Sequence, residues 1–146
     1  MPRQFPIFIA ALLLSLAGPI HAQTTPVIDV YKSRYCGCCE KWVEHMRKNG
    51  FKLVVHETEN VPAERRKLGM PDAFASCHTA RIGSYLIEGH VPASDIRRML
   101  KEKPKALGIA APGMPPGSPG MDIPNSPPYD TVLVQADGSY RVFAKH

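Results

Sequence analysis

Residues 31–46 read YKSRYCGCCEKWVEHM, and they place three cysteines within four positions at the start of a segment with helical spacing. Apolar residues recur there on one helix face, and Asn49-Gly50 is a typical helix end. Alternating runs of β-branched and aromatic residues stand on both sides, at 27–31 and 51–57. The sequence therefore predicts strand, helix, strand, an order that suits a right-handed parallel βαβ unit.

The following segments predict a mixed α/β domain. Residues 61–70 are expected to form a short helix, because Pro62 suits its first turn. Residues 80–91 predict two short strands around a Glu-Gly turn, and the segment from 92 to 103 predicts an amphipathic helix. The predicted order is β-α-β-α-β-β-α with a C-x-x-C motif opening the first helix, which is a thioredoxin-like arrangement over residues 27–103.

The composition changes at Pro104. Residues 104–128 are dense in proline and glycine, so we expect no regular helix or strand there. Two alternating runs around an Asp-Gly pair then predict a β-hairpin over 131–144. We therefore expect a Pro/Gly/Met-rich C-terminal extension, residues 104–146, that wraps the domain and its cysteine site.

The first 22 residues have the pattern of an export signal. Arg3 supplies positive charge, an apolar run follows at 7–18, and Ala22 is a small residue suited to a cleavage site. The run is shorter than the ~20 residues that span a bilayer. We therefore expect a signal peptide over residues 1–22, cleaved after Ala22, and no stable membrane insertion afterwards.

The net charge of +5 does not indicate a nucleic-acid partner. Basic residues alternate with acidic ones, as in EKWVEHMRK and DIRRMLKEK, which is typical of solvated helix faces and not of a basic stripe. From this charge pattern, no nucleic acid is expected among the partners of the protein. The chain left after signal removal has the size of one ordinary domain.

The spacing of the cysteines favours chemistry over structural stapling. Four cysteines in an exported chain could form two disulfides, but neighbours at a helix start close no useful loop. A helix N-terminus stabilises thiolate, which makes Cys36 and Cys39 candidate catalytic residues with redox-pair spacing. Cys38 between them invites competing disulfides. Soft-metal binding explains Cys38 better, since sulfurs this close can chelate one ion or bridge two.

Cys77 lies just before the predicted third strand, in a loop that a thioredoxin-like fold places against the C-x-x-C motif. That loop normally carries a cis-proline, and here no proline stands between Pro71 and Pro92. A metal ligand is therefore favoured where a peptide substrate would be held; the alternative is a buried structural cysteine. His78 and His90 are further candidate ligands, or else ordinary hydrogen-bonded histidines.

Met114 and Met121 recur in the near-repeat PGMP…PGMD, in a segment with little else to bury. Methionine usually fills gaps in a core. In a loop restricted by proline, its thioether can instead reach a soft metal, and thioether is a ligand for Cu(I) and not a usual one for zinc. The pair therefore favours copper, although the thiolates alone would also suit zinc.

Three motifs in order carry a family resemblance: CGCCEKWVEHM, SCHTARIGSYLIEGHVPASDI and PGMPPGSPGMD. Together they resemble the CopG-type bacterial copper-resistance proteins over residues 27–143. The resemblance implies a periplasmic, thioredoxin-like domain whose C-terminal extension contributes to metal binding. It also implies copper at the cysteines and a role in interconverting Cu(I) and Cu(II). The matching ligand positions are Cys36, Cys38, Cys39, Cys77, Met114 and Met121.

We therefore expect a periplasmic protein of copper resistance that holds copper ions, more than one of them, in a thiolate-bridged site. In this hypothesis Cys36 and Cys39 also exchange electrons with copper. One alternative is a copper chaperone or buffer that serves a periplasmic efflux or oxidase system without redox turnover. The other is a thiol–disulfide oxidoreductase, which Cys38 and the missing proline beside Cys77 disfavour.

Overall fold

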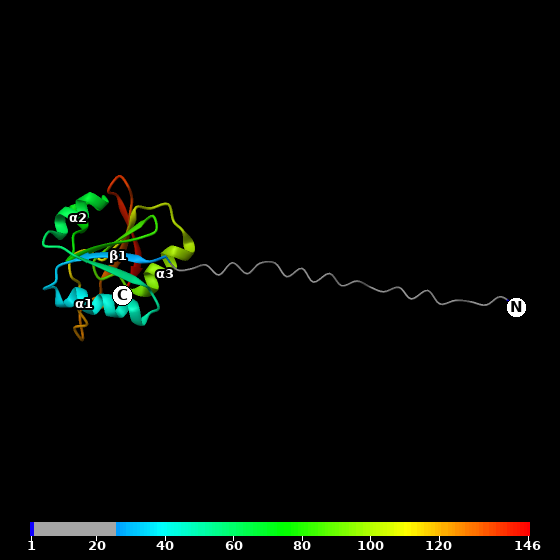
Figure 1. Ribbon diagram of the computed structural model, residues 1–146, viewed down its shortest axis with the longest axis horizontal. Coiled ribbons are helices and arrows are strands. Elements are labelled where there is room, and N and C mark those ends of the chain that lie inside the picture. The colour runs from blue at the N-terminus through cyan, green and yellow to red at the C-terminus, as the bar shows by residue number, and fades with distance from the viewer. Residues whose placement is uncertain (2–25) are drawn as a thin grey trace.

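The computed structural model describes Met1 and residues 26–146 (Figure 1). The expected signal peptide and its cleavage site after Ala22 fall on residues 2–25, outside the described part. Within the described residues, no helix combines the length and the apolar character needed to cross a bilayer.

The described chain is a mixed α/β fold, as the sequence predicts. Its elements follow in the order β1 (Ile28–Lys32), α1 (Gly37–Lys48), β2 (Leu53–Glu57), α2 (Val61–Leu68), the 3-10 turn η1 (Asp72–Phe74), β3 (His78–Ile82), β4 (Tyr85–Glu88), α3 (Ala93–Glu102), β5 (Gly108–Ala110), β6 (Asp130–Val134) and β7 (Tyr140–Lys145). Up to α3 this order contains the predicted strands and helices, with η1 added between α2 and β3. The turn between β3 and β4 lies at residues 83–84 and not at the predicted Glu-Gly pair, because Ile82 pairs with Tyr85 and Glu88 ends β4.

All seven strands join one sheet in the order β2-β1-β3-β4-β5-β6-β7. Strands β1 and β2 are parallel, as expected for a βαβ unit, and β3 runs antiparallel to β1 on its other side. Helices α1 and α3 lie on one side of the sheet and α2 lies on the other (Figure 1). The sheet therefore separates two layers of helix.

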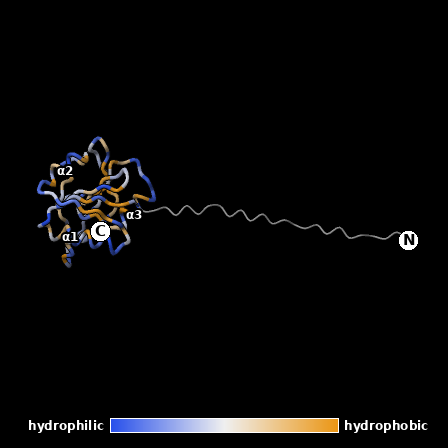
Figure 2. The backbone as a smooth tube through the Cα atoms, viewed as in Figure 1, coloured by the Kyte–Doolittle hydropathy of each residue, from blue (hydrophilic) through white to orange (hydrophobic). Residues whose placement is uncertain are grey.

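Each face of the sheet has its own apolar cluster. The larger one packs Trp42, Met46 and Ile96 of α1 and α3 against strand residues such as Ile28 and Ile87. The smaller one lies on the α2 side around Met70 and Phe74. In Figure 2 hydrophobic colour runs along the interior segments and hydrophilic colour lies on the outer turns. Burial of these apolar faces is the main force that fixes α1 on the sheet.

The expectation of no strand within 104–128 is wrong at β5. Residues 105–111 contain no proline, and Gly108–Ala110 are fully buried between β4 and β6. Gly108 lies so close to β4 that an added Cβ would stand 2.1 Å from the Leu86 carbonyl oxygen. The strand exists because it is paired on both sides, which a local pattern does not reveal.

The hairpin predicted over 131–144 corresponds to β6 and β7, which pair antiparallel with a shift between Thr131 and Val132. Because β6 also pairs with β5, the hairpin extends the same sheet. The segment between β5 and β6 then returns over the start of α1, where it meets the cysteines.

Candidate metal centre

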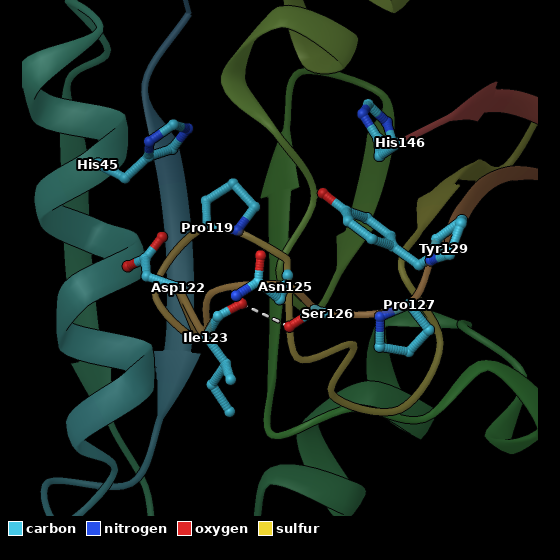
Figure 3. A pocket seen from close by; sticks show the side chains of 11 residues that line it. His45, Pro119, Asp122, Ile123, Asn125, Ser126, Pro127, Tyr129 and His146 are labelled. Carbon is cyan, nitrogen blue, oxygen red and sulfur yellow. Dashed lines mark hydrogen bonds between the residues drawn. The ribbon is translucent and has the colours of Figure 1, made fainter.

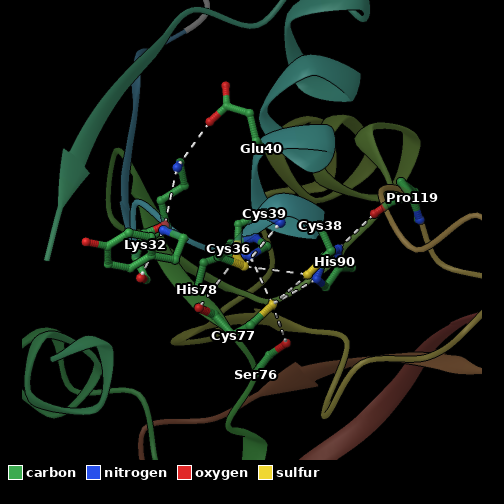
Figure 4. Close-up of a disulfide and its surroundings, with 12 residues drawn as sticks. Lys32, Cys36, Cys38, Cys39, Glu40, Ser76, Cys77, His78, His90 and Pro119 are labelled. Carbon is green, nitrogen blue, oxygen red and sulfur yellow. Dashed lines mark hydrogen bonds and ion pairs between the residues drawn. A yellow bond between two sulfur atoms is a disulfide. The ribbon is translucent and has the colours of Figure 1, made fainter. Parts of the chain in front are cut away.

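The first turn of α1 carries three of the four cysteines (Figure 4). Cys36 is the N-cap residue, and its sulfur accepts a hydrogen bond from the Cys39 backbone N–H at 3.3 Å. A disulfide joins these two cysteines, while Cys38 and Cys77 are free thiols. The unpaired N–H groups and the dipole of the helix start favour negative charge, so this turn can stabilise thiolates once the disulfide is reduced.

The four sulfurs converge from two distant parts of the chain. The Cys38 sulfur lies 3.5 Å from the Cys36 sulfur and 3.8 Å from the Cys77 sulfur. Cys77 comes from the loop between η1 and β3, as predicted, and all four Sγ atoms lie within 4.8 Å of one another. Thiolates at this spacing can share one soft metal ion or bridge several.

His90 adds a nitrogen to the sulfurs. It follows β4 through a turn at Gly89, and its Nε2 lies 2.9 Å from the Cys77 sulfur (Figure 4). Its Nδ1 donates a hydrogen bond to the Pro119 carbonyl at 2.9 Å. Because a carbonyl can only accept, the ring proton sits on Nδ1 and the lone pair of Nε2 faces the thiol. Burial lowers the pKa of His90 and so favours this neutral form. A ligating histidine held by a carbonyl at its other nitrogen is a usual metal-site arrangement.

His78 lies deeper than His90. It is fully buried, its Nδ1 is 3.7 Å from the Cys77 sulfur, and its ring packs against Trp42 and His90 at centroid distances of 4.4 and 4.9 Å. Burial, and then the neighbouring His90, lower the pKa of His78 to about 3, so the ring is neutral. Its Nε2 has no hydrogen-bond partner among the described residues. The ligand atoms of Cys77, His78 and His90 lie within 4.8 Å of one another and form a second group that could hold a metal ion.

The Cys77 thiol differs from the thiolate that a helix start would favour. Burial, and then the neighbouring Cys38, raise the pKa of Cys77 well above its ordinary value. Without metal, the thiol keeps its proton and can donate it toward the lone pair of His90 Nε2. A metal that binds here must displace that proton.

The C-terminal extension covers this cluster through Gly120. Its φ is +89°, and an added Cβ would stand 2.7 Å from the Cys38 carbonyl oxygen, 2.8 Å from the Trp42 nitrogen and 3.2 Å from His90 Nδ1. Only glycine fits this close approach. Sequence reasoning missed Gly120 and Pro119, because it interpreted the PGMP…PGMD repeat through its methionines. The glycine of that repeat was the available signal.

The two methionines follow residues that touch the site. Gly113, before Met114, donates its N–H to the Ala75 carbonyl at 3.0 Å and accepts a hydrogen bond from the Ser76 hydroxyl. Met114 itself is 53% exposed, and Met121 directly follows Gly120. Coordination by the two thioethers stays a prediction, supported by where their backbone lies.

Two comparisons with known proteins bear on this geometry. Residues 74–121 match the profile of a family described as a protein of unknown function, DUF411. Two solved structures, described as copper resistance protein CopG in Form 1 and Form 2, are 40% identical to this chain and similar in fold, each with a TM-score of 0.78. The match covers 84% of this chain and 98% and 99% of those chains. This chain belongs to the CopG-type family. No protein with a curated description matches it.

In this CopG-type chain, a buried ion pair holds the loop that carries Cys77 by hydrogen bonds. Arg65 Nε donates to Glu88 Oε1 at 2.7 Å, and Arg65 Nη2 donates to the Ser76 carbonyl at 2.6 Å. The Ser76 N–H donates to the same carboxylate oxygen of Glu88 at 2.8 Å. Arg65 and Glu88 are 3% and 0% exposed.

Both backbone groups of Ser76 are thus fixed directly before Cys77. The described residues contain no cis peptide bond, so this loop of the CopG-type chain is held by an ion pair in place of a cis-proline. Sequence reasoning missed the pair, because it placed Glu88 in a turn and found no signal that Arg65, in the helix of residues 61–70, is buried. Their contact is visible only once α2 and β4 are brought together.

Beyond Pro119, the CopG-type chain has a separate pocket of about 580 Å³ (Figure 3). His45, Asp122, Tyr129 and His146 are among the residues that line it. His45 Nε2 accepts a hydrogen bond from the Ala93 N–H at 3.2 Å, so this histidine serves the pocket wall and α3. Pro119 lines the pocket and also orients His90, so it separates the pocket from the cysteine cluster.

Proposed function

We propose that this protein binds copper as its cargo in bacterial copper resistance, in the periplasm. The observation that carries the proposal is the convergence of four sulfurs with an imidazole whose lone pair is already directed at them. Soft thiolates select Cu(I) among the biological metals, and zinc is less favoured. Membership of the CopG-type family, whose solved structures are described as copper resistance proteins, supports the same cargo. The proposed ligands are Cys36, Cys38, Cys39, Cys77, His78, His90, Met114 and Met121.

The local topology supports a thioredoxin-like domain over residues 27–103. A C-x-x-C motif opens the helix of a parallel β1-α1-β2 unit, and the loop before an antiparallel strand faces that motif. In our proposal, the extension over 104–146 completes the copper site, with Pro119 and Gly120 as its closest contacts. The signal peptide over residues 1–22 would deliver the chain to the periplasm.

Several copper ions fit this donor set better than one. The sulfur separations of 3.5 and 3.8 Å allow a thiolate to bridge neighbouring ions, which is a usual role for cysteine with Cu(I). Cys36 and Cys39 have a second proposed role as the pair that exchanges electrons when copper changes between Cu(I) and Cu(II). Their disulfide is the oxidised form of such a pair, and it must be reduced before both thiolates can bind copper.

The test of this proposal is anaerobic Cu(I) binding by the reduced mature chain beginning at Gln23. We expect the wild type to hold Cu(I) against a competing chelator. The variant with Cys36→Ser, Cys38→Ser and Cys39→Ser should lose most of this binding, whereas His56→Ala, a change at a half-exposed histidine that pairs with Asp29, should lose none. Equal copper content in the wild type and the triple variant would sink the proposal.

The alternative is a chaperone or buffer that passes copper to an efflux or oxidase system without redox turnover. The close cover of the site by Gly120 favours it, because a covered site suits retention of the ion. The two functions are separated by adding a periplasm-compatible thiol reductant and then oxygen to the copper complex. A redox protein should change the oxidation state of its copper and retain the metal, whereas a buffer should not.

The last alternative, thiol–disulfide exchange on other proteins, is tested by insulin reduction with metal-free protein. We expect weak activity in the wild type and in Cys38→Ser. Strong activity in both would favour this alternative over copper chemistry.

A further inference from the structure

We propose that Cys38 and Cys77 form a second redox pair beside Cys36 and Cys39, so that the fully oxidised chain contains two disulfides. The reduced chain would then convert about four Cu(II) ions to Cu(I), where a single C-x-x-C pair would convert about two. This inference rests on the proposed function in one respect, since Cu(II) is its oxidant.

The geometry leaves these two thiols facing each other. With Cys36 and Cys39 joined, Cys38 and Cys77 are the remaining cysteines, and their sulfurs stand 3.8 Å apart. A disulfide has a sulfur–sulfur separation of about 2.05 Å, so the two sulfurs must approach by about 1.8 Å for the bond to form. The Cys39 sulfur instead faces the Cys77 carbonyl oxygen, at 3.7 Å.

The pairing also gives Cys38 a partner. A third sulfur beside a C-x-x-C pair is a competitor in thiol–disulfide exchange if it stands alone. Cys77 makes the number of sulfurs even and approaches Cys38 from another loop. The vicinal alternative, a bond between Cys38 and Cys39, would close a strained small ring.

The chemical step balances with Cu(II) as the one-electron oxidant. Two S–H bonds break at Cys38 and Cys77, one S–S bond forms, and two Cu(II) ions each take one electron to become Cu(I). Two protons are released. The proton of Cys77 passes to His90 Nε2, 2.9 Å from its sulfur, and then to solvent, while the proton of Cys38 leaves directly. The same balance at Cys36 and Cys39 accounts for the other two electrons.

A cysteine pair that has given up its electrons can then no longer hold copper. Thiolates bind Cu(I) strongly, and both thiolates of a pair are lost when its disulfide forms. The fully reduced chain would hold copper, and the chain with both disulfides would release it as Cu(I).

The test counts electrons in the full mature chain. Reduced, metal-free protein at low micromolar concentration is mixed anaerobically with excess Cu(II) and a Cu(I)-specific chelator. We expect about four Cu(I) ions per chain and, in a non-reducing peptide map, one peptide pair joined through Cys38 and Cys77. Fragmentation of the joined peptides assigns the bond, because Cys36, Cys38 and Cys39 lie on one peptide. The map needs no variant, so a folding defect cannot obscure it.

Paired variants assign the electrons. Changing both Cys36 and Cys39 to serine should leave about two Cu(I) ions per chain and an intramolecular Cys38–Cys77 bond, and changing both Cys38 and Cys77 should also leave about two. The matched control changes Cys36 and Cys77 to serine and keeps the thiols of Cys38 and Cys39. Because a bond between these neighbours would close a strained small ring, this variant should yield few Cu(I) ions as a monomer.

Two results would overturn the inference: about two Cu(I) ions from the wild type with Cys38 and Cys77 still open to alkylation, or a Cys38–Cys77 bond found only between molecules. Failure of the proposed function would give a different result, because reduced protein would then retain no Cu(I) in the separate binding assay. A chain that retains Cu(I) but supplies two electrons contradicts this inference alone.

Discussion

Gly120 sets how closely the C-terminal extension approaches the cysteine-bearing helix. Any larger side chain would meet the Cys38 carbonyl and the Trp42 nitrogen, and would push Pro119 away from His90. The residue contributes no donor atom. It acts through the hydrogen bond that fixes the His90 ring, so its effect on copper is indirect.

We expect Gly120→Ala to weaken Cu(I) binding about 10- to 100-fold, as loss of a ligand's supporting contact does in other metal sites. Its backbone strain at positive φ should also cost about 1–3 kcal/mol of unfolding free energy. Gly138→Ala is the matched control, because Gly138 has φ +82° with open space around it. Chelator competition and urea unfolding measure the two effects. Equal copper affinity in both variants would contradict the role of Gly120.

His78 makes the stability of the metal-free protein depend on pH. Its pKa is about 3 in the folded chain, below the ordinary value of 6.5, because burial disfavours the charged ring. Between these two values the unfolded chain binds a proton that the folded chain does not. Stability from His78 is therefore complete above pH 6.5 and falls as pH drops toward 3, by about 1.4 kcal/mol per pH unit.

The measurement is the unfolding free energy in urea at pH 4 to 7 for wild type and His78→Phe. Phenylalanine keeps an aromatic ring against Trp42 and cannot titrate. The difference between the two proteins should grow as the pH falls, which removes the contribution of other groups such as His90. Parallel pH profiles would show that His78 does not titrate as described.

At the scale of elements, α2 and β4 position a loop that belongs to neither. The Arg65–Glu88 pair holds the N–H and the C=O of Ser76 and so places Cys77 opposite α1. A buried ion pair is costly to break because the remaining charge has no partner and no water. This cost makes the pair a rigid support.

We expect Glu88→Gln to destabilise the metal-free fold by about 3–5 kcal/mol, since Arg65 would keep a buried charge. Replacing both residues, Arg65→Met with Glu88→Leu, should recover part of that stability but not the copper affinity, because Ser76 stays unheld. Glu44→Gln at the exposed Lys48 pair is the control and should cost less than about 1 kcal/mol. Full copper affinity in the double variant would exclude a positioning role.

The elements with a local pattern could be predicted from the sequence. The β1-α1-β2 order follows from alternation, helical spacing and an Asn-Gly end, and the cysteines and His90 stand in recognisable motifs. Strand β5 could not be predicted, because pairing with β4 and β6 creates it. Sequence analysis did not identify Gly120, Arg65 and Glu88 for a similar reason: each contacts atoms that are distant in sequence.

At the scale of the whole molecule, the sheet does not end where the composition changes. Strands β5, β6 and β7 continue it past β4, and Ile109, Leu133 and Phe143 belong to the larger apolar cluster. Without them, β4 would be an open edge beside an uncovered core, which favours aggregation.

We therefore expect a fragment ending at Lys103 to be poorly folded, with exposed apolar surface. Light scattering and dye binding to apolar surface would measure this for the fragment and the full mature chain. Because the fragment keeps all four cysteines, loss of copper binding in it would reflect structure and not missing thiolates. A monomeric, cooperatively folding fragment would contradict this view of the sheet.

Pro119 lies between two sites, the proposed copper site on one side and the pocket of His45 and Tyr129 on the other. A molecule bound in that pocket would displace the Pro119 carbonyl that orients His90. The copper affinity of the protein then reports whether the neighbouring pocket is occupied, and compounds can be screened against the pocket by competition for Cu(I).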